Sequence, residues 1–178
     1  KRIRKYNELH ELLIHNGANL EDVSILRKMK QLGFLKLDKC PKLRSFPKFT
    51  RKHDLVNLNL FSLHKSFEMS NLKHIPRLLN FRVGDLAFET FPADLSNTLR
   101  QAKIFDNPKL RDITKLAKYP ELITIKLYNT GLTHFDIDFE DRAIHTIDLE
   151  GNKYLSNVDG LCTFSKIEKL TLKNLPML

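Results

Sequence analysis

A short pattern of apolar residues, L-x-x-L-x-L, recurs along almost the whole chain of 178 residues. The pattern starts at residues 9, 32, 55, 78, 99, 122, 144 and 167, so successive starts are 21 to 23 residues apart. All 24 positions that it specifies are apolar, whereas apolar residues make up only 42% of the chain. A repeat of this length cannot bury its apolar side alone, so the pattern predicts a solenoid of about eight stacked repeats.

Three stretches extend the pattern to twelve residues, and they cover residues 32–43, 99–110 and 144–155. In the first stretch Cys40 follows the last strand leucine by three residues, and Asn107 and Asn152 hold the same place in the other two. The extended pattern, L-x-x-L-x-L-x-x-N/C-x-x-L, resembles the leucine-rich repeat family over about residues 9–178. The resemblance implies an α/β solenoid shaped as a horseshoe, with a parallel sheet on the concave face and mixed helical and extended convex segments. It also implies a role in recognition.

The sequence departs from this family at the position where a side-chain amide normally satisfies backbone groups of the turn. The eight repeats carry Gly17, Cys40, Leu63, Leu86, Asn107, Thr130, Asn152 and Leu175 there. Only two of these residues are asparagine. We therefore expect irregular turns around Leu63, Leu86 and Leu175.

Two convex segments have local patterns that predict different conformations. Asn19 is a suitable N-cap, and Glu21 and Asp22 would lie in the first turn, so a helix is predicted over residues 20–31. In residues 135–139, phenylalanine and isoleucine alternate with aspartate, and this alternation predicts an extended segment.

Two rows of side chains are expected on the concave face, because successive residues of a strand point to opposite faces. The residue between the last two leucines gives the row Leu13, Lys36, Asn59, Arg82, Lys103, Lys126, Asp148 and Thr171. The residue after the last leucine gives the row His15, Asp38, Phe61, Gly84, Phe105, Tyr128, Glu150 and Lys173. Exposed rings beside cations are typical of interaction hot spots. The predicted partner-binding residues are therefore Lys36, Phe61, Arg82, Lys103, Phe105, Lys126 and Tyr128. The alternative is that the lysines merely solvate the face of a sheet.

The charge distribution bears on the kind of partner. The chain has a formal charge of +9, and residues 1–52 hold 14 Lys and Arg against 5 Asp and Glu, whereas residues 53–178 hold 16 of each. We expect a protein partner, acidic in character, bound through the concave face, with the chain acting as the substrate- or ligand-reading part of a larger protein. The alternative is a nucleic-acid or chromatin-associated domain that uses the same basic surface. Five acidic residues expected on that face, Asp38, Asp85, Asp106, Asp148 and Glu150, argue against nucleic acid. A third hypothesis is a structural spacer.

The sequence gives no support for catalysis. It contains no GxGxxG, GxxxxGK[ST] or GxSxG, and its seven histidines are scattered without HExxH spacing. They are expected at the surface or in turns. The acidic stretch 134–141 lacks the ligand spacing of a calcium loop, so a solvated outer face is expected. We predict a protein that is not an enzyme and that needs no cofactor, metal or small-molecule substrate.

The two cysteines and the chain ends lead to predictions about compartment and extent. Cys40 and Cys162 lie five repeats apart, too far for a disulfide, and are expected to be buried thiols. Without a signal-peptide core or a long apolar run, the chain is predicted to be intracellular, in the cytoplasm or alternatively the nucleus, and not in a membrane. Residues 1–8 are expected to be a basic lead-in. Because the last repeat stops part-way, we expect a fragment of a longer protein whose uncovered leucines cause aggregation.

Overall fold

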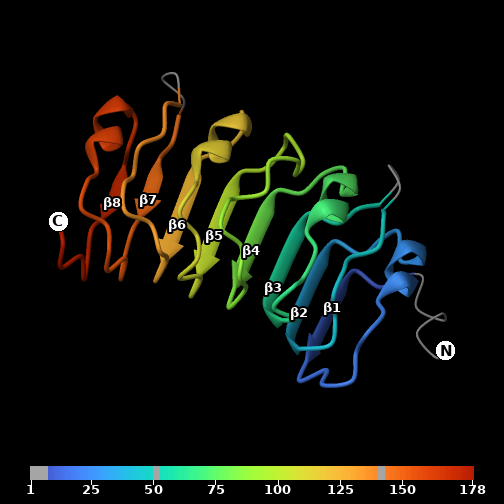
Figure 1. Ribbon diagram of the computed structural model, residues 1–178. Helices are drawn as coiled ribbons and strands as arrows, with labels where there is room; N and C mark the ends of the chain where they lie inside the picture. Colours follow the sequence, from blue (N-terminus) through green and yellow to red (C-terminus); the bar gives the residue numbers. More distant parts are fainter. Residues whose placement is uncertain (1–7, 50–52, 140–142) are drawn as a thin grey trace.

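The computed structural model describes residues 8–49, 53–139 and 143–178. Eight strands form a single all-parallel sheet in chain order, with short 3-10 helices in the return segments (Figure 1). The elements are β1 (Glu11–His15), η2 (Ser24–Lys28), β2 (Phe34–Cys40), β3 (Asn57–Leu63), η3 (Ser70–His74), β4 (Asn80–Gly84), β5 (Gln101–Phe105), η4 (Thr114–Lys118), β6 (Thr124–Tyr128), β7 (Thr146–Asp148), η5 (Asp159–Thr163) and β8 (Lys169–Thr171). The predicted parallel sheet is therefore confirmed, and its open form is consistent with a solenoid. The expected lead-in falls almost wholly on residues 1–7, outside the described residues.

The strands pair so that equivalent positions of successive repeats lie side by side. Leu12 pairs with Leu35, Leu35 with Leu58, and Leu58 with Phe81. The leucines of the pattern point into the layer between sheet and return segments, and Leu35 and Leu58 are fully buried. Burial of these side chains supplies the main driving force for stacking, at about 25 cal/mol per Å² of apolar surface.

A left-handed residue lies at the end of the strand, or shortly after it, in every repeat. The residues are Asn16, Lys39, Ser62, Asp85, Asp106, Asn129, Gly151 and Asn174, with φ between +48° and +75°. Their intervals equal those of the leucine pattern, so backbone conformation marks the same repeats independently of the leucines. Asn, Asp and Gly tolerate this conformation best, and six of the eight residues are of these types.

The turns expected to be irregular share this left-handed residue. It lies directly before Leu63, Leu86 and Leu175, and directly before the corresponding residue in each of the remaining repeats. Leu63 and Leu86 are buried, so an apolar side chain fills the space that an amide takes in other repeats. The left-handed conformation therefore does not depend on the amide. Beyond it, the carbonyls of Cys40, Asn107 and Asn152 each accept the N–H of the residue three positions later. At Leu63 this bond is shifted to His64 and Phe67, and at Leu86 none is formed among the described residues, so the expected irregularity is confirmed at these two turns. It is not found at Leu175, whose carbonyl accepts the Leu178 N–H as in the regular turns.

The helices of the return segments are 3-10 helices of five residues each, which corrects the helix predicted over residues 20–31. Leu26 donates its N–H to Val23, Met29 to Leu26, and Leu32 to Met29, always to the carbonyl three residues earlier. These four residues are buried, and a spacing of three places them on one face of a 3-10 helix rather than an α-helix. Asn19 caps nothing; its side chain accepts a hydrogen bond from Lys42 at 2.9 Å.

Helical and extended return segments alternate along the molecule. Helices η2, η3, η4 and η5 recur every 44 to 46 residues, which is every second repeat. The described parts of the intervening segments contain no helix. Residues 135, 137 and 139 are buried while 136 and 138 are exposed, as the predicted extended segment requires. Isolated parallel bridges join each extended segment to the next repeat, at Ser45–Glu68, Thr90–Asp112 and His134–Asn157. The outer layer is therefore built from pairs of repeats.

No helix among the described residues is long and apolar enough to cross a membrane.

Candidate partner-binding site on the open face of the sheet

The structure places all seven predicted partner-binding residues on the open face of the sheet, the face predicted to be concave. Strand register sets Lys36 beside Asn59, Asn59 beside Arg82, Arg82 beside Lys103, and Lys103 beside Lys126. The neighbouring row runs through Asp38, Phe61, Gly84, Phe105 and Tyr128 in the same way. Their role in binding stays a prediction, but their juxtaposition follows from the register.

The three aromatic side chains, called the ring row (Phe61, Phe105 and Tyr128), form a continuous surface. The centroids of Phe105 and Tyr128 lie 5.0 Å apart with planes at 10°, and those of Phe61 and Phe105 lie 6.0 Å apart. Phe61 and Phe105 lie on β3 and β5, with Gly84 of β4 between them. Because Gly84 has no side chain, the two rings can come into contact across β4. A Cβ atom at Gly84 would lie 2.8 Å from Phe61 Cδ1 and 3.1 Å from Phe105 Cβ. Glycine here is therefore required by close approach.

The four cations differ in whether the chain supplies them with a carboxylate. Lys36 Nζ lies 3.6 Å from Asp38 Oδ2, and Lys126 Nζ lies 3.5 Å from Asp148 Oδ2. These two residues are the flanking lysines. For Arg82, the described part of the chain provides no ion-pair partner within 4.0 Å.

The same holds for Lys103, so Arg82 and Lys103 are called the central cations. Burial lowers the pKa of Lys103, and the charges of Arg82 and Lys126 lower it further. The middle of the face thus carries positive charge that nothing in the described structure neutralises.

Asp148 organises one end of the site. Its side chain is 9% exposed, and Oδ2 accepts a hydrogen bond from the Tyr128 hydroxyl at 2.6 Å and also faces Lys126. Burial, and then this hydrogen bond, raise the pKa of Tyr128. Oδ1 is buried and has no hydrogen-bond partner within the described residues. At the other end Asp38 accepts from His15 Nδ1 at 2.8 Å.

A third row, the amide row, lies on the other side of the cations. It comprises Asn57, Asn80 and Gln101, and Asn80 Nδ2 donates to Asn57 Oδ1. With Phe34, Asn59 and Arg82 these residues line a hollow of about 290 Å³. Sequence reasoning missed this row, although three amides at one position of successive repeats were a visible signal.

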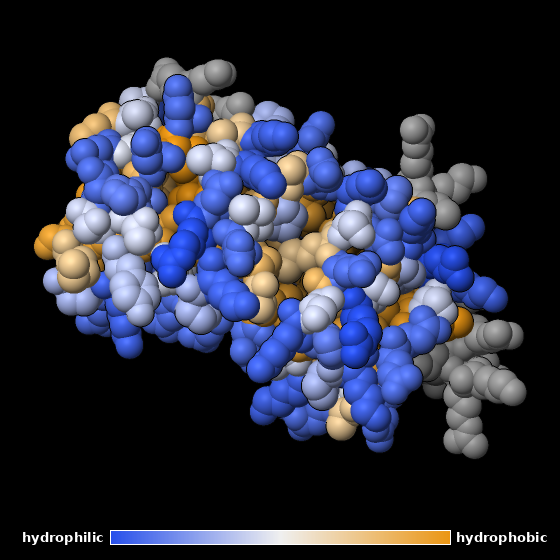
Figure 2. Space-filling model, viewed as in Figure 1, coloured by the Kyte–Doolittle hydropathy of each residue, from blue (hydrophilic) through white to orange (hydrophobic). Residues whose placement is uncertain are grey.

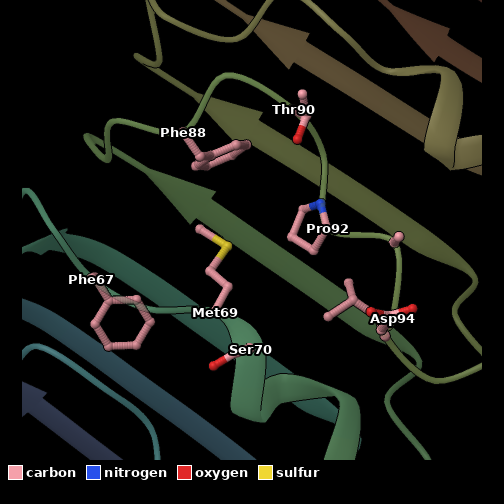
Figure 3. A pocket seen from close by; sticks show the side chains of 9 residues that line it. Phe67, Met69, Ser70, Phe88, Thr90, Pro92 and Asp94 are labelled. Carbon is pink, nitrogen blue, oxygen red and sulfur yellow. The ribbon is translucent and has the colours of Figure 1, made fainter.

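A second hollow, of about 270 Å³, lies in the outer layer between the third and fourth repeats. Figure 3 shows Phe67, Met69 and Ser70 on one side and Phe88 and Pro92 on the other, with the Met69 side chain pointing between the last two. Its lining includes Asp94 as the single charged residue and none of the seven predicted residues. The cations and the ring row lie together on the open face of the sheet, and we therefore place the candidate site there.

Two expectations about acidic residues and metals are refined. Asp38 and Asp148 occupy the rows of the open face, but Asp85 and Asp106 occupy the left-handed turns after the strands. Within residues 8–49, 53–139 and 143–178, no group of three or more His, Cys, Asp or Glu could hold a metal ion. The acidic stretch 134–141 lies partly outside the described residues.

One histidine and one cysteine differ from expectation. His53 is buried rather than at the surface, because Nε2 hydrogen-bonds the Leu26 carbonyl and Nδ1 accepts the Leu55 N–H. Burial lowers its pKa. Cys40 is buried as expected, but Cys162 is exposed because it lies on η5 facing away from the core; both are free thiols.

Neither a scan against models of known protein families nor a search of curated proteins finds a match to this chain. The function must therefore be argued from the geometry of the open face.

Proposed function

We propose that the chain is a non-catalytic protein-interaction module of the leucine-rich repeat type, which binds an acidic protein segment on its open face. One observation carries the proposal: among the described residues no carboxylate lies within 4.0 Å of the central cations Arg82 and Lys103, and these cations lie beside a continuous ring row. A ligand carboxylate would supply the missing charge, and an apolar side chain would cover the rings. Covering one such side chain is worth about 1.5–3 kcal/mol.

The leucine-rich repeat type is supported by asparagines at the position where a side-chain amide is expected to satisfy backbone groups of the turn. Asn152 Oδ1 accepts the Thr130 N–H at 2.9 Å and its Nδ2 donates to the Leu127 carbonyl at 2.8 Å, which links two repeats inside the turn. Asn107 Nδ2 donates to the Phe88 carbonyl at 3.1 Å. In the leucine-rich repeat family, the asparagine at this position is expected to form such hydrogen bonds to backbone groups of the turn.

Preorganisation favours recognition by this surface. Phe105 and Tyr128 are stacked, and the Tyr128 hydroxyl is fixed by Asp148, so binding needs little further ordering of these side chains. Side chains that are already ordered lose less entropy on association, at a saving of about 0.5–1.5 kcal/mol each.

Nucleic acid fits the same face less well. A phosphate backbone is held by several cations in a track, but Lys36 and Lys126 already face carboxylates. Asp38 and Asp148 would also lie near the phosphates at both ends of the track. The arrangement favours one or two acidic groups rather than a polyanion.

Selection from a random peptide library tests the proposal. The parent chain is compared with the variants F105A/Y128A and K103E/K126E on the open face, and with K115E/K118E on η4 as a matched charge control. We expect the parent and the control to enrich acidic peptides that the two open-face variants fail to bind.

Two results would overturn the proposal. Folded open-face variants that keep every peptide bound by the parent would exclude this face. Oligonucleotide binding with a steep salt dependence, lost in K103E/K126E, would establish the nucleic-acid alternative instead.

A further inference from the structure

We infer that Arg82 and Lys103 on the open face bind a single carboxylate of the ligand. One apolar side chain of the ligand, next to this carboxylate, packs on Phe105 and Tyr128. The flanking lysines take no direct part in binding. This inference rests on the proposed function, which supplies an acidic protein segment as the ligand. Two cations would contact one acidic group of this segment, and the apolar side chain would lie at a fixed distance from that group.

The ion pair between Asp38 and Lys36 is a model for how a ligand carboxylate would pair with Arg82. Asp38 lies two residues beyond Lys36 on the same strand and forms an ion pair with it. The corresponding residue beyond Arg82 is Gly84, which has no side chain, and the Phe61 ring packs against it. Arg82 therefore has the same position as Lys36 but lacks the carboxylate that neutralises it.

Lys126 is neutralised from the adjacent strand. Asp148 pairs with Lys126 in the register of β6 and β7 and forms the ion pair at 3.5 Å. On the adjacent strand β5, Lys103 has Arg82 and Lys126 as its row neighbours, and both are cations. A ligand carboxylate between Arg82 and Lys103 would relieve this repulsion, and its attraction to Lys36 and Lys126 would be weakened by Asp38 and Asp148.

The spacing of the rows sets the spacing of the ligand groups. The central cations and the ring row are two residues apart along each strand, which corresponds to about 7 Å. An extended peptide places the side chains of residues i and i+2 on one side at the same spacing. The ligand segment should therefore contain an acidic residue and an apolar residue separated by one residue. The amide row, on the far side of the cations, offers donors and acceptors to the peptide backbone.

The test uses an acetylated and amidated peptide, Ser-Glu-Ser-Phe-Ser, whose only carboxylate is the glutamate. Its dissociation constant is measured by NMR titration of the ¹⁵N-labelled chain, a method that detects even millimolar binding. Control peptides carry glutamine in place of glutamate, or serine in place of phenylalanine. The variants are R82Q and K103Q, with K36Q and K126Q as matched controls that remove the same charge from the same row.

We expect R82Q and K103Q each to weaken binding about three- to tenfold, as for a partly solvated charge-assisted contact. K36Q and K126Q should change the dissociation constant less than about twofold. The glutamine peptide, which lacks the carboxylate that both central cations bind, should bind the parent chain at least as weakly as the glutamate peptide binds R82Q. Equal losses in all four variants would show diffuse attraction and overturn the inference, as would equal binding of the glutamate and glutamine peptides.

Failure of the inference and failure of the proposed function have different signatures. If this peptide does not bind but the library yields peptides that need the open face, the inference is wrong and the proposed function stands. If neither experiment gives binding that depends on the open face, both are wrong.

Discussion

Asp148 controls how much positive charge the open face presents to a ligand. Its carboxylate holds Lys126 and the Tyr128 hydroxyl at once, and it is nearly inaccessible to solvent. Asp38 holds Lys36 at the opposite end. The two aspartates therefore confine the unneutralised charge to Arg82 and Lys103.

Replacing Asp148 with asparagine should strengthen binding of the acidic peptide. The amide oxygen can still accept the Tyr128 hydroxyl, but Lys126 loses its counter-charge and becomes available to the ligand. We expect an affinity increase of about two- to fivefold, measured by the same NMR titration. D38N, the matched change at Lys36, should have a smaller effect because Lys36 is farther from the central cations. An unchanged or weaker affinity in D148N would show that the carboxylate acts only by holding Tyr128.

Binding of an acidic ligand should depend on pH through Lys103. Its pKa is lowered from 10.5 because the half-buried ammonium lies beside Arg82 and Lys126, and a bound carboxylate favours the charged form. Binding therefore raises the pKa, and affinity should fall as the pH rises through the pKa of the free protein. K103R keeps its charge throughout and should give a flatter profile between about pH 7 and pH 10. If the affinities of the parent chain and K103R decrease equally with rising pH, the pH dependence belongs to another group.

For individual residues of the open face, the sequence predicted which side chains share the face but not how they interact. The seven predicted residues were found by counting positions, because strand alternation fixes the face of each side chain. The close approach of Phe61 and Phe105 at Gly84, and the hydrogen bond from Tyr128 to Asp148, depend on how side chains pack across neighbouring strands. Counting positions along the sequence gives no information about this packing.

Short 3-10 helices and non-helical segments share the outer layer, and the spacing of their apolar residues distinguishes the two kinds of segment. Val23, Leu26, Met29 and Leu32 are spaced by three, and so are Ile113, Leu116, Tyr119 and Leu122. A spacing of three matches the 3-10 helix, whereas an α-helix would need a mixture of three and four. The polar residues at 19, 21 and 22 suggested a longer helix because capping signals do not indicate how many turns follow.

Tyr119 shows how the outer layer is fastened between repeats. The side chain is 1% exposed, its hydroxyl donates to the Pro92 carbonyl, and it accepts the Leu95 N–H at 3.1 Å. Burial raises the pKa of Tyr119 to about 12. Because Pro92 and Leu95 belong to the preceding repeat, one hydroxyl links two return segments.

Removing that hydroxyl should destabilise the fold. Y119F leaves the Pro92 carbonyl and the Leu95 N–H without their partner, and an unsatisfied buried group costs about 1–3 kcal/mol. We expect a decrease of that size in the free energy of unfolding, measured by urea denaturation. Y154F removes the hydroxyl of a tyrosine that is 57% exposed and should change stability by less than about 0.5 kcal/mol. Equal effects of the two variants would contradict the assigned role.

Among the described residues, β8 is the last strand of the sheet and has one unpaired edge. Leu170, Leu172, Met177 and Leu178 are 40% to 62% exposed, and Figure 2 shows apolar side chains at the end of the molecule where the C-terminus lies. β8 pairs with β7 on one side only, and an unpaired strand edge is a template for association.

The chain of 178 residues should therefore self-associate through this edge. Analytical ultracentrifugation should show a mass that rises with concentration, and L172K/L178K should shift the distribution toward monomer by placing charges on the exposed apolar surface. Control substitutions L13K, on the open face, and Y154K, at another exposed apolar position, should leave self-association unchanged. A monodisperse monomer of the parent at all concentrations would exclude this behaviour.

The molecule's topology followed from the sequence because a single repeated pattern dictates strand order, direction and register. The alternation of its return segments did not, because the leucines recur in every repeat and conceal the longer period. The longer period is carried by the residues around 24, 70, 114 and 159, which resemble one another more than they resemble residues of the adjacent repeats.

This alternation restricts how the chain can change in length. Each extended segment forms its bridge with the repeat that follows it, so the unit that can be added or deleted without new contacts is a pair of repeats, 44 to 46 residues long. Loss of one repeat would place two helical or two extended segments side by side, where no bridge of the described kind exists. Viable length variants should therefore differ from this chain by even numbers of repeats.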